Sequence, residues 1–221
     1  MGAMRVILDL MLPPACAACG SVGALVCSAC LRAARPASDP ACRFVAPDPA
    51  IAIGQDLSLA LAAFAFEGPI RRALARLKYE GARRLAGPLA TAATPPLNVL
   101  LEITGAVPFV PVPVHRERLR ERGYNQAELI ARAMGATVGL PVIDRLERVR
   151  PTTKQHRLDR AARLANLRSA FSVRAAPTTM PGAVVVVDDI VTTTATLEAC
   201  ASVLRSAGVR EVYGFAVARE I

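Results

Sequence analysis

Residues Val184–Thr196, VVVVDDIVTTTAT, contain the pattern that decides the fold of this chain. Four valines run unbroken into the adjacent carboxylates Asp188 and Asp189, and four threonines crowd the positions that follow. An unbroken run of β-branched residues indicates a central strand of a parallel sheet, because such strands are covered on both faces. An apolar helical pattern then continues to Gly208. The stretch therefore predicts a strand, a polar loop and a helix, with the loop where ligands bind in such folds.

The predicted loop also has the chemistry of a phosphate site. Its backbone N–H groups and the start of the helix can cradle an anion. The two carboxylates beside it suit sugar hydroxyls or a metal ion held by phosphate. The alternative is a buried strand followed by an ordinary capped helix, with the two acids on the surface.

This stretch resembles the diphosphate-sugar signature of the type I phosphoribosyltransferases, in which apolar residues precede two acids, two apolar residues and a Thr/Gly-rich phosphate loop. The resemblance implies an α/β domain with a type I phosphoribosyltransferase-like parallel sheet flanked by helices. Family members usually have glycine where Thr194 stands, and glycine lets the backbone bend freely or approach a phosphate closely. Thr194 either supplies a hydroxyl group instead or weakens binding.

Length and composition set the outer limits. The 221 residues suffice for one α/β domain and a small appendage, and a chain that is 53% hydrophobic and 20% charged is not disordered. No apolar run is long enough to span a bilayer. The first 16 residues combine one arginine with a short apolar stretch, as a signal peptide does, but Asp9 and Pro13-Pro14 favour an amphipathic helix. The protein is therefore expected in the cytoplasm, where thiols stay reduced.

Four cysteines near the N-terminus have the spacing C-x2-C-x7-C-x2-C, at Cys16, Cys19, Cys27 and Cys30. Two close pairs can place four thiolates tetrahedrally around one zinc ion, in a closed site with a structural role. Two disulfides or four unrelated thiols are the alternatives, and a reducing compartment favours zinc. Cys200 follows the threonine loop in an apolar helical pattern, so we expect it in the core.

The predicted domains are a zinc-binding module at 1–45, a linker rich in proline and alanine at 46–56, and a phosphoribosyltransferase-like domain at 57–221. Early in the last domain, Leu57–Phe66 predicts a strand, and a helix is expected to open at Pro69.

Prolines mark two later segments. Residues 85–103 predict a helix that Pro95 and Pro96 interrupt. Ala106–Val112 predicts the first strand of the main sheet, at an edge or with a bent end because of its prolines. Beyond residue 126 an apolar stripe predicts an amphipathic helix.

Basic residues outnumber acidic ones by 27 to 18, which indicates an anionic partner. Fourteen of the basic residues lie in 115–174, beside six acidic ones. All of the basic residues except Lys78 and Lys154 are arginine. Genome composition alone can explain part of this arginine, as plain solvated surface.

A series of short motifs resembles the ComF family of competence proteins. They are PVP at Pro111–Pro113, RGYNQ at Arg122–Gln126, T-x-x-Q at Thr152–Gln155, R-x-x-N at Arg163–Asn166 before Phe171, and DD-x-x-TT at Asp188–Thr193. With the N-terminal cysteines, the resemblance covers almost the whole chain. Members often carry a second cysteine pair after the first zinc site. Only Cys42 stands in that region here, so we expect one zinc ion.

The resemblance implies a site for phosphoribosyl diphosphate with Mg²⁺. The residues that would hold the sugar 5-phosphate are Thr192, Thr193, Thr194, Ala195 and Thr196. Asp188 and Asp189 would hold the ribose hydroxyls and the Mg²⁺ that the pyrophosphate shares. His115 and Arg116 would form the pyrophosphate loop, and the alternative for His115 is a capping or surface residue.

Arg150–Arg163 resembles the mobile lid of this fold, with Lys154, Gln155 and Arg157 over the donor. A solvated basic helix face is the alternative. Asp189 and Lys154 are the candidate catalytic residues. The hood that selects an acceptor is expected within 57–105, where no base-binding pattern is recognisable.

Three functions stay open. The ComF resemblance implies a competence protein for DNA uptake in natural transformation, cytoplasmic or peripheral at the inner-membrane uptake site. It would bind phosphoribosyl diphosphate or a nucleotide, single-stranded DNA, and DNA-uptake motor and recombination-loading proteins. The alternatives are an active phosphoribosyltransferase on an unidentified acceptor and a ligand-sensing adaptor without catalysis. The chain has no Walker A loop, so it is not itself a motor.

Overall fold

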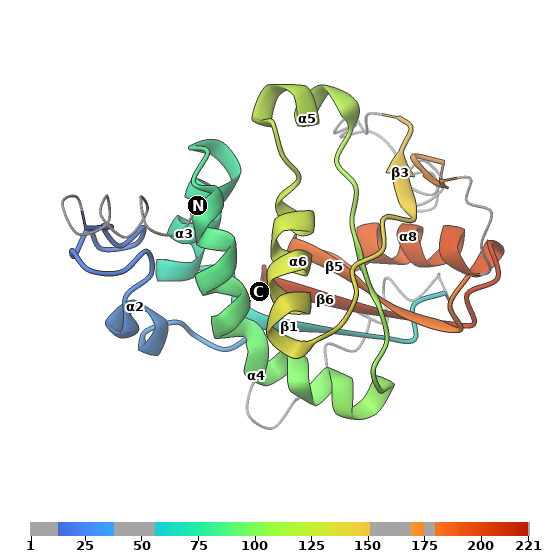
Figure 1. Ribbon diagram of the computed structural model, residues 1–221, viewed down its shortest axis with the longest axis horizontal. Helices are drawn as coiled ribbons and strands as arrows, with labels where there is room; N and C mark the ends of the chain where they lie inside the picture. The colour runs from blue at the N-terminus through green and yellow to red at the C-terminus, as the bar shows by residue number, and fades with distance from the viewer. Residues whose placement is uncertain (1–12, 38–55, 151–168, 175–179, 221) are drawn as a thin grey trace.

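A computed structural model gives the fold and describes residues 13–37, 56–150, 169–174 and 180–220 (Figure 1). Four parallel strands form the main sheet of these described segments, in the order β1-β6-β5-β2. The strands are β1 (Leu59–Ala65), β2 (Phe109–Pro111), β5 (Ala183–Val191) and β6 (Glu211–Arg219). A separate antiparallel pair consists of β3 (Leu146–Arg148) and β4 (Phe171–Val173).

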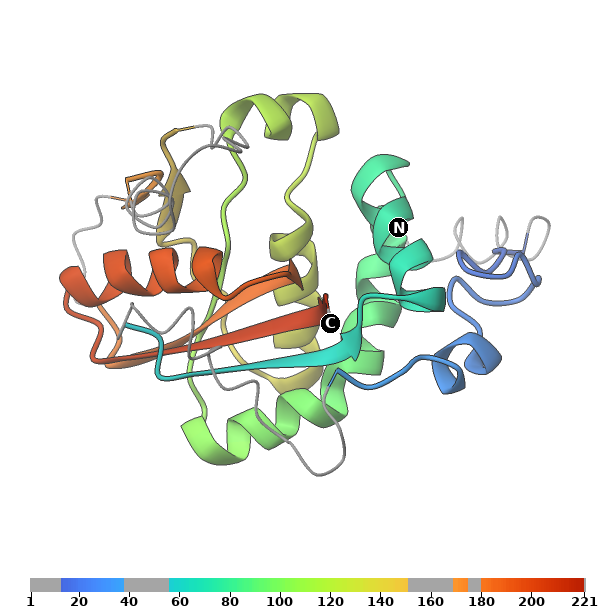
Figure 2. The same cartoon turned by 180° about the vertical axis from the view of Figure 1, so that it is seen from behind.

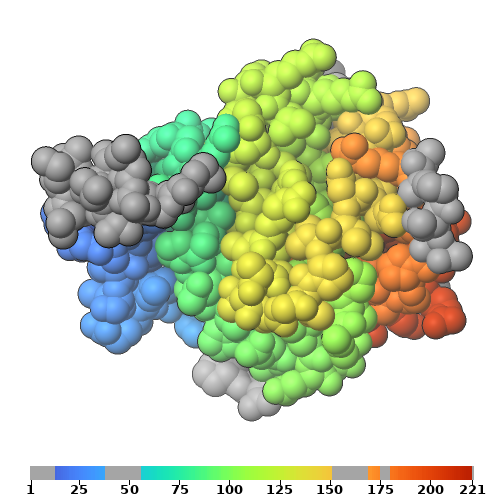
Figure 3. All heavy atoms as spheres, viewed as in Figure 1, coloured from blue at the N-terminus to red at the C-terminus, as the bar shows by residue number. Residues whose placement is uncertain are grey.

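Helices cover both faces of the sheet. α4 (Ala86–Thr104) and α6 (Gln126–Val138) lie on one face, with α3 (Gly68–Tyr79) beside them, and α8 (Ala195–Ser206) lies on the other (Figure 1, Figure 2). The shorter helices are α2 (Ser28–Arg32), the 3-10 helix η1 (Arg83–Leu85) and α5 (Arg116–Arg122). In Figure 3, α5 rises at the top of the molecule. Within the described segments, no helix is both long and apolar enough to cross a membrane.

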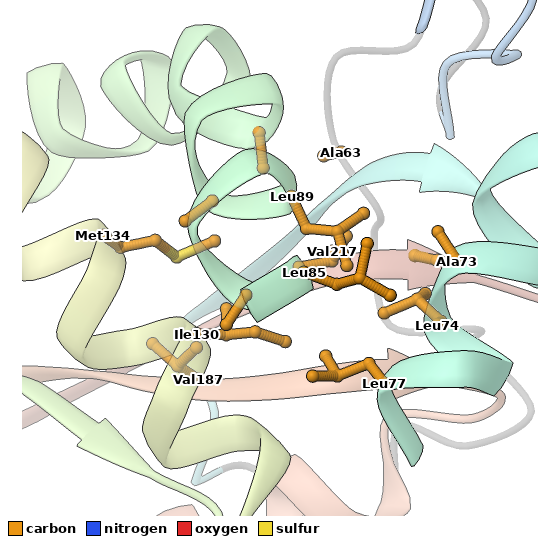
Figure 4. Close-up of a cluster of buried hydrophobic side chains, with 14 of the residues drawn as sticks. Ala63, Ala73, Leu74, Leu77, Leu85, Leu89, Ile130, Met134, Val187 and Val217 are labelled. Atoms are coloured by element: carbon orange, nitrogen blue, oxygen red, sulfur yellow. The ribbon is translucent and has the colours of Figure 1, made fainter. Parts of the chain in front are cut away.

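Strand β5 is buried on both sides, as its valine run predicts. Val185 and Val187 point into the core under α4 and α6, where Ile130 also lies (Figure 4). Val184 and Val186 point into a second core under α8. Alternate residues of a strand face opposite sides, so each helical layer covers half of the run. This arrangement confirms the predicted α/β class, a parallel sheet flanked by helices.

Strand β5 is longer than predicted. The sequence pattern placed Asp188 and Asp189 in a loop after Val187, but the strand continues to Val191. Its ladder with β6 also continues, because Asp188 pairs with Ala216 and Val191 pairs with Arg219. The reason is that the β-branched pattern resumes directly after the two acids. Both carboxylates therefore stand on a rigid strand.

The prediction that residues 106–112 form the first strand of the main sheet is wrong. β1 comes earlier in the chain and pairs in parallel with β6 in the same sheet. Its alanine-rich sequence was a weak strand signal, but it is almost entirely buried between the two helical layers. The proline argument holds for β2, which is short and lies at the other edge of the sheet.

The predicted interruption of the 85–103 helix is also wrong, because α4 runs unbroken through Pro95 and Pro96. Proline removes a backbone donor from the helix ladder. One face of α4 is nevertheless fully buried along its length, from Leu89 to Leu100. Tertiary packing of this face supplies most of the stability of such a helix, and it outweighs the two missing N–H groups.

The N-terminal module is attached to the edge of the main sheet. The Ala37 N–H donates to the Ala63 carbonyl (3.1 Å), and the Ala65 N–H donates to the Arg35 carbonyl (2.9 Å). Helix α2 packs against α3 at the same side of the molecule (Figure 1). The segment thus covers the outer edge of β1, which would otherwise expose unpaired backbone groups.

Candidate functional site

A cavity of about 140 Å³ lies at the carboxyl ends of β2 and β5. Its lining includes both acids of β5, the residues that follow β2, and basic side chains from α3, α5 and β3. The polar and charged members of the lining are Lys78, Arg118, Arg122, Asn125, Gln126, Arg148, Asp188, Asp189 and Thr196. Ligands bind at this end of the strands in open α/β sheets.

The two acids differ in their surroundings. The Asp189 N–H donates to Oδ1 of Asp188 (2.8 Å), and the Ile190 N–H donates to Oδ1 of Asp189 (3.0 Å). Oδ2 of Asp189 is buried and has no hydrogen-bond partner among the described residues. The ammonium group of Lys78 lies 3.8 Å from it. The Asp189 side chain is only 10% exposed, so this interaction is poorly screened.

Burial and the charge of Asp189 raise the pKa of Asp188 well above its ordinary value, and the charge of Lys78 partly opposes the rise. Two carboxylates on successive residues repel each other, and the charge of Arg148 interacts with Asp188 in addition to that of Lys78. Carboxylate oxygens accept from hydroxyl donors and are ligands that Mg²⁺ prefers. Asp188 and Asp189 are therefore the residues that would hold a magnesium ion carried by a phosphorylated ligand.

Lys78 is a site residue that its place in the sequence does not indicate. It lies in the helix expected to open at Pro69, and the end of α3 brings it to the acids of β5. The sequence does contain one indication that Lys78 is unusual. Lys78 is one of only two lysines among 27 basic residues, the others being arginine. A lysine is a compact point charge, which suits a close approach to a single carboxylate oxygen.

The RGYNQ motif holds the end of α3 in place. The hydroxyl of Tyr124 donates to the Leu77 carbonyl, and the Gln126 side chain donates to the Lys78 carbonyl (3.5 Å). The side chain of Asn125 accepts from the Ala127 N–H (3.1 Å) as the cap of α6 and donates to the Val112 carbonyl (2.9 Å). The motif therefore joins α3, α6 and the end of β2 around the cavity.

Gly123 of the same motif meets a steric requirement. Its φ of 74° is left-handed, which glycine adopts without strain. A side chain there would place its Cβ 2.7 Å from Nη2 of Arg83. Arg83 uses this close approach to donate to the Gly123 carbonyl (3.1 Å), and its guanidinium lies 4.6 Å from the ring centroid of Tyr124.

The threonine loop leads directly into α8. Thr192 and Thr193 are exposed, whereas Thr194 is buried at the N-cap of the helix. The φ of Thr194 is −69°, so no glycine is required at this position. Its hydroxyl oxygen has no hydrogen-bond partner within the described segments. Thr196, in the first turn of α8, lines the cavity.

The predicted pyrophosphate residues lie beside the cavity and do not line it. His115 is the N-cap of α5, where its Nδ1 accepts from the Glu117 N–H (3.5 Å). His115 thus caps the helix, and its place in a pyrophosphate loop stays a prediction. Arg116 is 80% exposed and lies 4.0 Å from Glu147. The lid residues Lys154, Gln155 and Arg157 lie outside the described residues.

The basic lining of the cavity instead comes from Arg118 and Arg122 of α5 and Arg148 of β3. The guanidinium of Arg148 lies 5.4 Å from the ring centroid of Phe171. Burial and the charge of Arg118 lower the pKa of Arg148 below its ordinary value. The arginines thus crowd one another, which an anion between them would relieve.

The four N-terminal cysteines come together in a second site. Their sulfur atoms all lie within 4.8 Å of one another, with Cys16 and Cys30 3.8 Å apart and Cys19 and Cys27 3.7 Å apart. Four sulfurs held tetrahedrally at about 2.3 Å from zinc lie roughly 3.8 Å from one another. Burial and the neighbouring sulfurs raise the pKa of Cys30 to about 12, whereas burial of Cys16 is outweighed by backbone hydrogen bonds, which lower its pKa to about 6. All four sulfurs can be thiolates together only with a cation among them. The cluster fits a structural zinc ion.

Of the two remaining cysteines, only Cys200 lies within the described residues. Cys200 is fully buried in the core under α8, as predicted. Cys42 lies outside the described residues, as do the T-x-x-Q and R-x-x-N motifs.

Comparison with known proteins supports the zinc site and shows which proteins the chain resembles. Residues 7–51 match the double zinc ribbon domain family. The chain is 34% identical over 113 residues to competence protein F of Haemophilus influenzae, a match that covers 50% of this chain and 49% of that protein. It is 27% identical over 208 residues to DNA utilization protein YhgH of Salmonella typhimurium, which covers 89% of this chain and 91% of that protein.

The chain is thus a homologue of both proteins and carries an N-terminal zinc ribbon, whose four cysteines form the zinc site. The aligned region with competence protein F spans about half the length of that relative.

Proposed function

We propose that this homologue of competence protein F binds a phosphorylated sugar, phosphoribosyl diphosphate or a nucleotide, in the cavity at the ends of β2 and β5, and that it acts in DNA uptake. The observation that carries the proposal is Asp189 Oδ2, a buried oxygen of a residue that lines the cavity, without a hydrogen-bond partner in the described segments. Thr194 Oγ1, at the adjoining N-cap of α8, is a second such oxygen. Leaving a buried polar atom unpaired costs about 1–3 kcal/mol, so such atoms are few in native proteins. A ligand with hydroxyl and phosphate groups would pair with both.

Each part of such a ligand has a suitable neighbour. The N-terminus of α8 and the Thr194 hydroxyl suit the 5-phosphate. Asp188 and Asp189 suit the ribose hydroxyls, and Lys78 keeps part of their charge compensated before the ligand arrives. The arginines of α5 and β3 that line the cavity suit the pyrophosphate.

A calorimetric titration with phosphoribosyl diphosphate and Mg²⁺ tests the proposal. We expect one ligand per chain, and we expect Asp188→Asn/Asp189→Asn to lose binding while it stays folded. Wild-type protein that produces no binding heat and no thermal shift would overturn the sugar-phosphate site. Asp144→Asn is a suitable control, because Asp144 is an exposed acid paired with Arg174 away from the cavity.

Single-stranded DNA is the second ligand that we propose. Helix α5 has no buried residue and carries four arginines beside two glutamates, so it presents a cationic surface to a phosphate backbone. The chain has few aromatic residues, 4% in all, which favours backbone contacts over extensive base stacking. The names of two relatives, a competence protein and a DNA utilization protein, support the proposal that this surface binds DNA.

Catalysis is a separate question from binding. Release of pyrophosphate from the donor in the presence of candidate acceptors, and its loss in Asp189→Ala, would identify a phosphoribosyltransferase. Donor binding without turnover that changes the affinity for oligonucleotides would instead identify a ligand-sensing adaptor.

A further inference from the structure

Tyr79 is an aromatic side chain with little cover. It is 73% exposed, more than any other large apolar side chain in the described residues. It is the last residue of α3 and directly follows Lys78, which lines the cavity. The guanidinium of Arg122, another lining residue, lies 5.4 Å from the Tyr79 ring centroid. Tyr79 therefore stands at the rim of the cavity, with most of its ring open to solvent.

The cavity is too small for a whole nucleotide. Its volume is about 140 Å³, whereas sites that enclose an entire small molecule occupy about 300–1,000 Å³. A cavity of this volume encloses only part of a nucleotide. Any group attached to the sugar must leave through the rim, where the Tyr79 ring and the Arg122 guanidinium lie.

No unpaired acid among the described residues next to Tyr79 would repel the electron-rich ring of a nucleobase. The nearest acid in sequence, Glu80, is held by Arg76 at 2.8 Å. Arg122 offers a cation beside the Tyr79 ring, and planar guanidinium and phenol groups both stack on nucleobases. Every base has a π-face, so an exposed tyrosine accepts any of them.

We propose that Tyr79 and Arg122 form a base-stacking platform, so that the cavity takes the sugar phosphate of a nucleotide while its base stacks on the exposed ring of Tyr79. The proposal rests on the proposed sugar-phosphate site and specifies its ligand class, a base-bearing nucleotide in place of a bare sugar phosphate. It also assigns a base contact to a part of the chain, 57–105, in which the sequence shows no base-binding pattern.

The test compares two probes, adenosine 5′-monophosphate and ribose 5-phosphate, each with Mg²⁺, on the full chain by calorimetry. The wild type is expected to bind the nucleotide about 5- to 150-fold more tightly than the sugar phosphate, which is the range for stacking of one base. Tyr79→Ala should lose this difference and keep the affinity for ribose 5-phosphate. Tyr79→Phe should retain it, because the ring and not the hydroxyl stacks.

Ile103→Ala is the matched control, because it removes another exposed apolar side chain, at the end of α4 and outside the cavity lining. Equal affinities of the wild type for the two probes would overturn the platform and leave the sugar-phosphate site standing. Nucleotide binding that depends on Tyr79, without binding of ribose 5-phosphate, would support the platform and overturn the sugar-phosphate site. Failure of both probes to bind would overturn both.

Discussion

The ammonium nitrogen of Lys78, at the end of α3, lies 3.8 Å from Oδ2 of Asp189, in the second half of β5. This pair joins two elements that are more than a hundred positions apart in the sequence. Burial and the charge of Asp189 raise the pKa of Asp188, the other acid of the strand, and Lys78 only partly opposes this rise. Both acids line the cavity, where their oxygens would face a ligand's hydroxyl groups or a cation that it carries.

Asp188→Asn is expected to stabilise the free protein and to weaken ligand binding. It removes a charge that burial and Asp189 destabilise, and it retains the side-chain oxygen that accepts from the Asp189 N–H. We expect the free energy of unfolding in urea to rise by about 0.5–2 kcal/mol. The affinity for phosphoribosyl diphosphate with Mg²⁺ should fall about tenfold or more. A variant that is less stable and binds as tightly as the wild type would contradict this account.

The same substitution should have a pH-dependent effect. The folded state retains the proton of Asp188 above the ordinary pKa of 3.8 that applies to the unfolded chain. It then binds more protons than the unfolded state, so the contribution of Asp188 to the free energy of unfolding becomes less favourable as pH rises. The stability gain of Asp188→Asn is expected to be small near pH 3.8 and to grow toward neutral pH. A gain that is constant from about pH 4 to about pH 8 would exclude this origin.

Thr194→Val tests the unpaired hydroxyl. The substitution preserves shape and removes a buried oxygen without a partner in the described segments, so stability should stay equal or rise by up to about 1 kcal/mol. Affinity for the phosphorylated ligand should fall about tenfold, because one charge-assisted hydrogen bond is lost. Thr194→Gly should instead destabilise the protein by about 0.5–1 kcal/mol. At a φ of −69° glycine relieves no strain, and it loses more conformational entropy on folding than threonine does. Thermal unfolding and calorimetry separate these outcomes.

Tyr124→Phe tests the attachment of α3. The Tyr124 hydroxyl donates to the carbonyl of Leu77, next to Lys78, so its removal should loosen the position of the lysine. We expect a loss of about 0.5–1.5 kcal/mol in stability and a several-fold weaker ligand affinity. The control is Tyr213→Phe in β6, where no hydrogen bond of the hydroxyl is present among the described residues. Ligand affinity that is unchanged in Tyr124→Phe would show that Lys78 is positioned by other contacts.

Zinc removal should act on the whole domain, not on the ribbon alone. Metal analysis is expected to find one zinc ion per chain, bound by the four-cysteine cluster. Cys16→Ser or a strong chelator should unfold the ribbon, because structural zinc supplies its folding energy. The outer edge of β1 would then lose the backbone bonds to residues 35–37 and promote aggregation. A melting temperature and solubility that do not depend on zinc would contradict this coupling.

Removal of two arginines from α5 should reduce the salt dependence of DNA binding. Arg116→Gln/Arg120→Gln removes two exposed cations outside the cavity lining. Each lost phosphate contact lowers the slope of log affinity against log salt by about 0.7 for a single strand, so the slope should fall by about 1.4 in magnitude. Arg132→Gln, on an exposed arginine paired with Glu128 in α6, is the control. An unchanged slope in the double variant would remove α5 from the DNA-binding surface.

The sequence by itself determined the features that depend on neighbouring residues. The valine run predicted a strand covered on both faces, the cysteine spacing predicted the four-sulfur cluster, and the proline-rich stretch predicted an edge strand. These patterns are local because backbone periodicity and ligand spacing operate over a few residues. The sequence did not show what the short motifs do. RGYNQ was recognisable as a motif, but the sequence did not predict its contacts with α3 and with the end of β2.

Only the tertiary structure decided which distant groups meet. Lys78 and Tyr79 belong to a segment with an ordinary helical pattern, and Arg122 opens the RGYNQ motif. The residues beside them in the sequence do not indicate that they reach the acids of β5 or the rim of the cavity. The unbroken course of α4 through two prolines also followed from burial of its apolar face against the sheet. In each case the deciding free energy comes from packing between elements far apart in the chain, which local propensity does not contain.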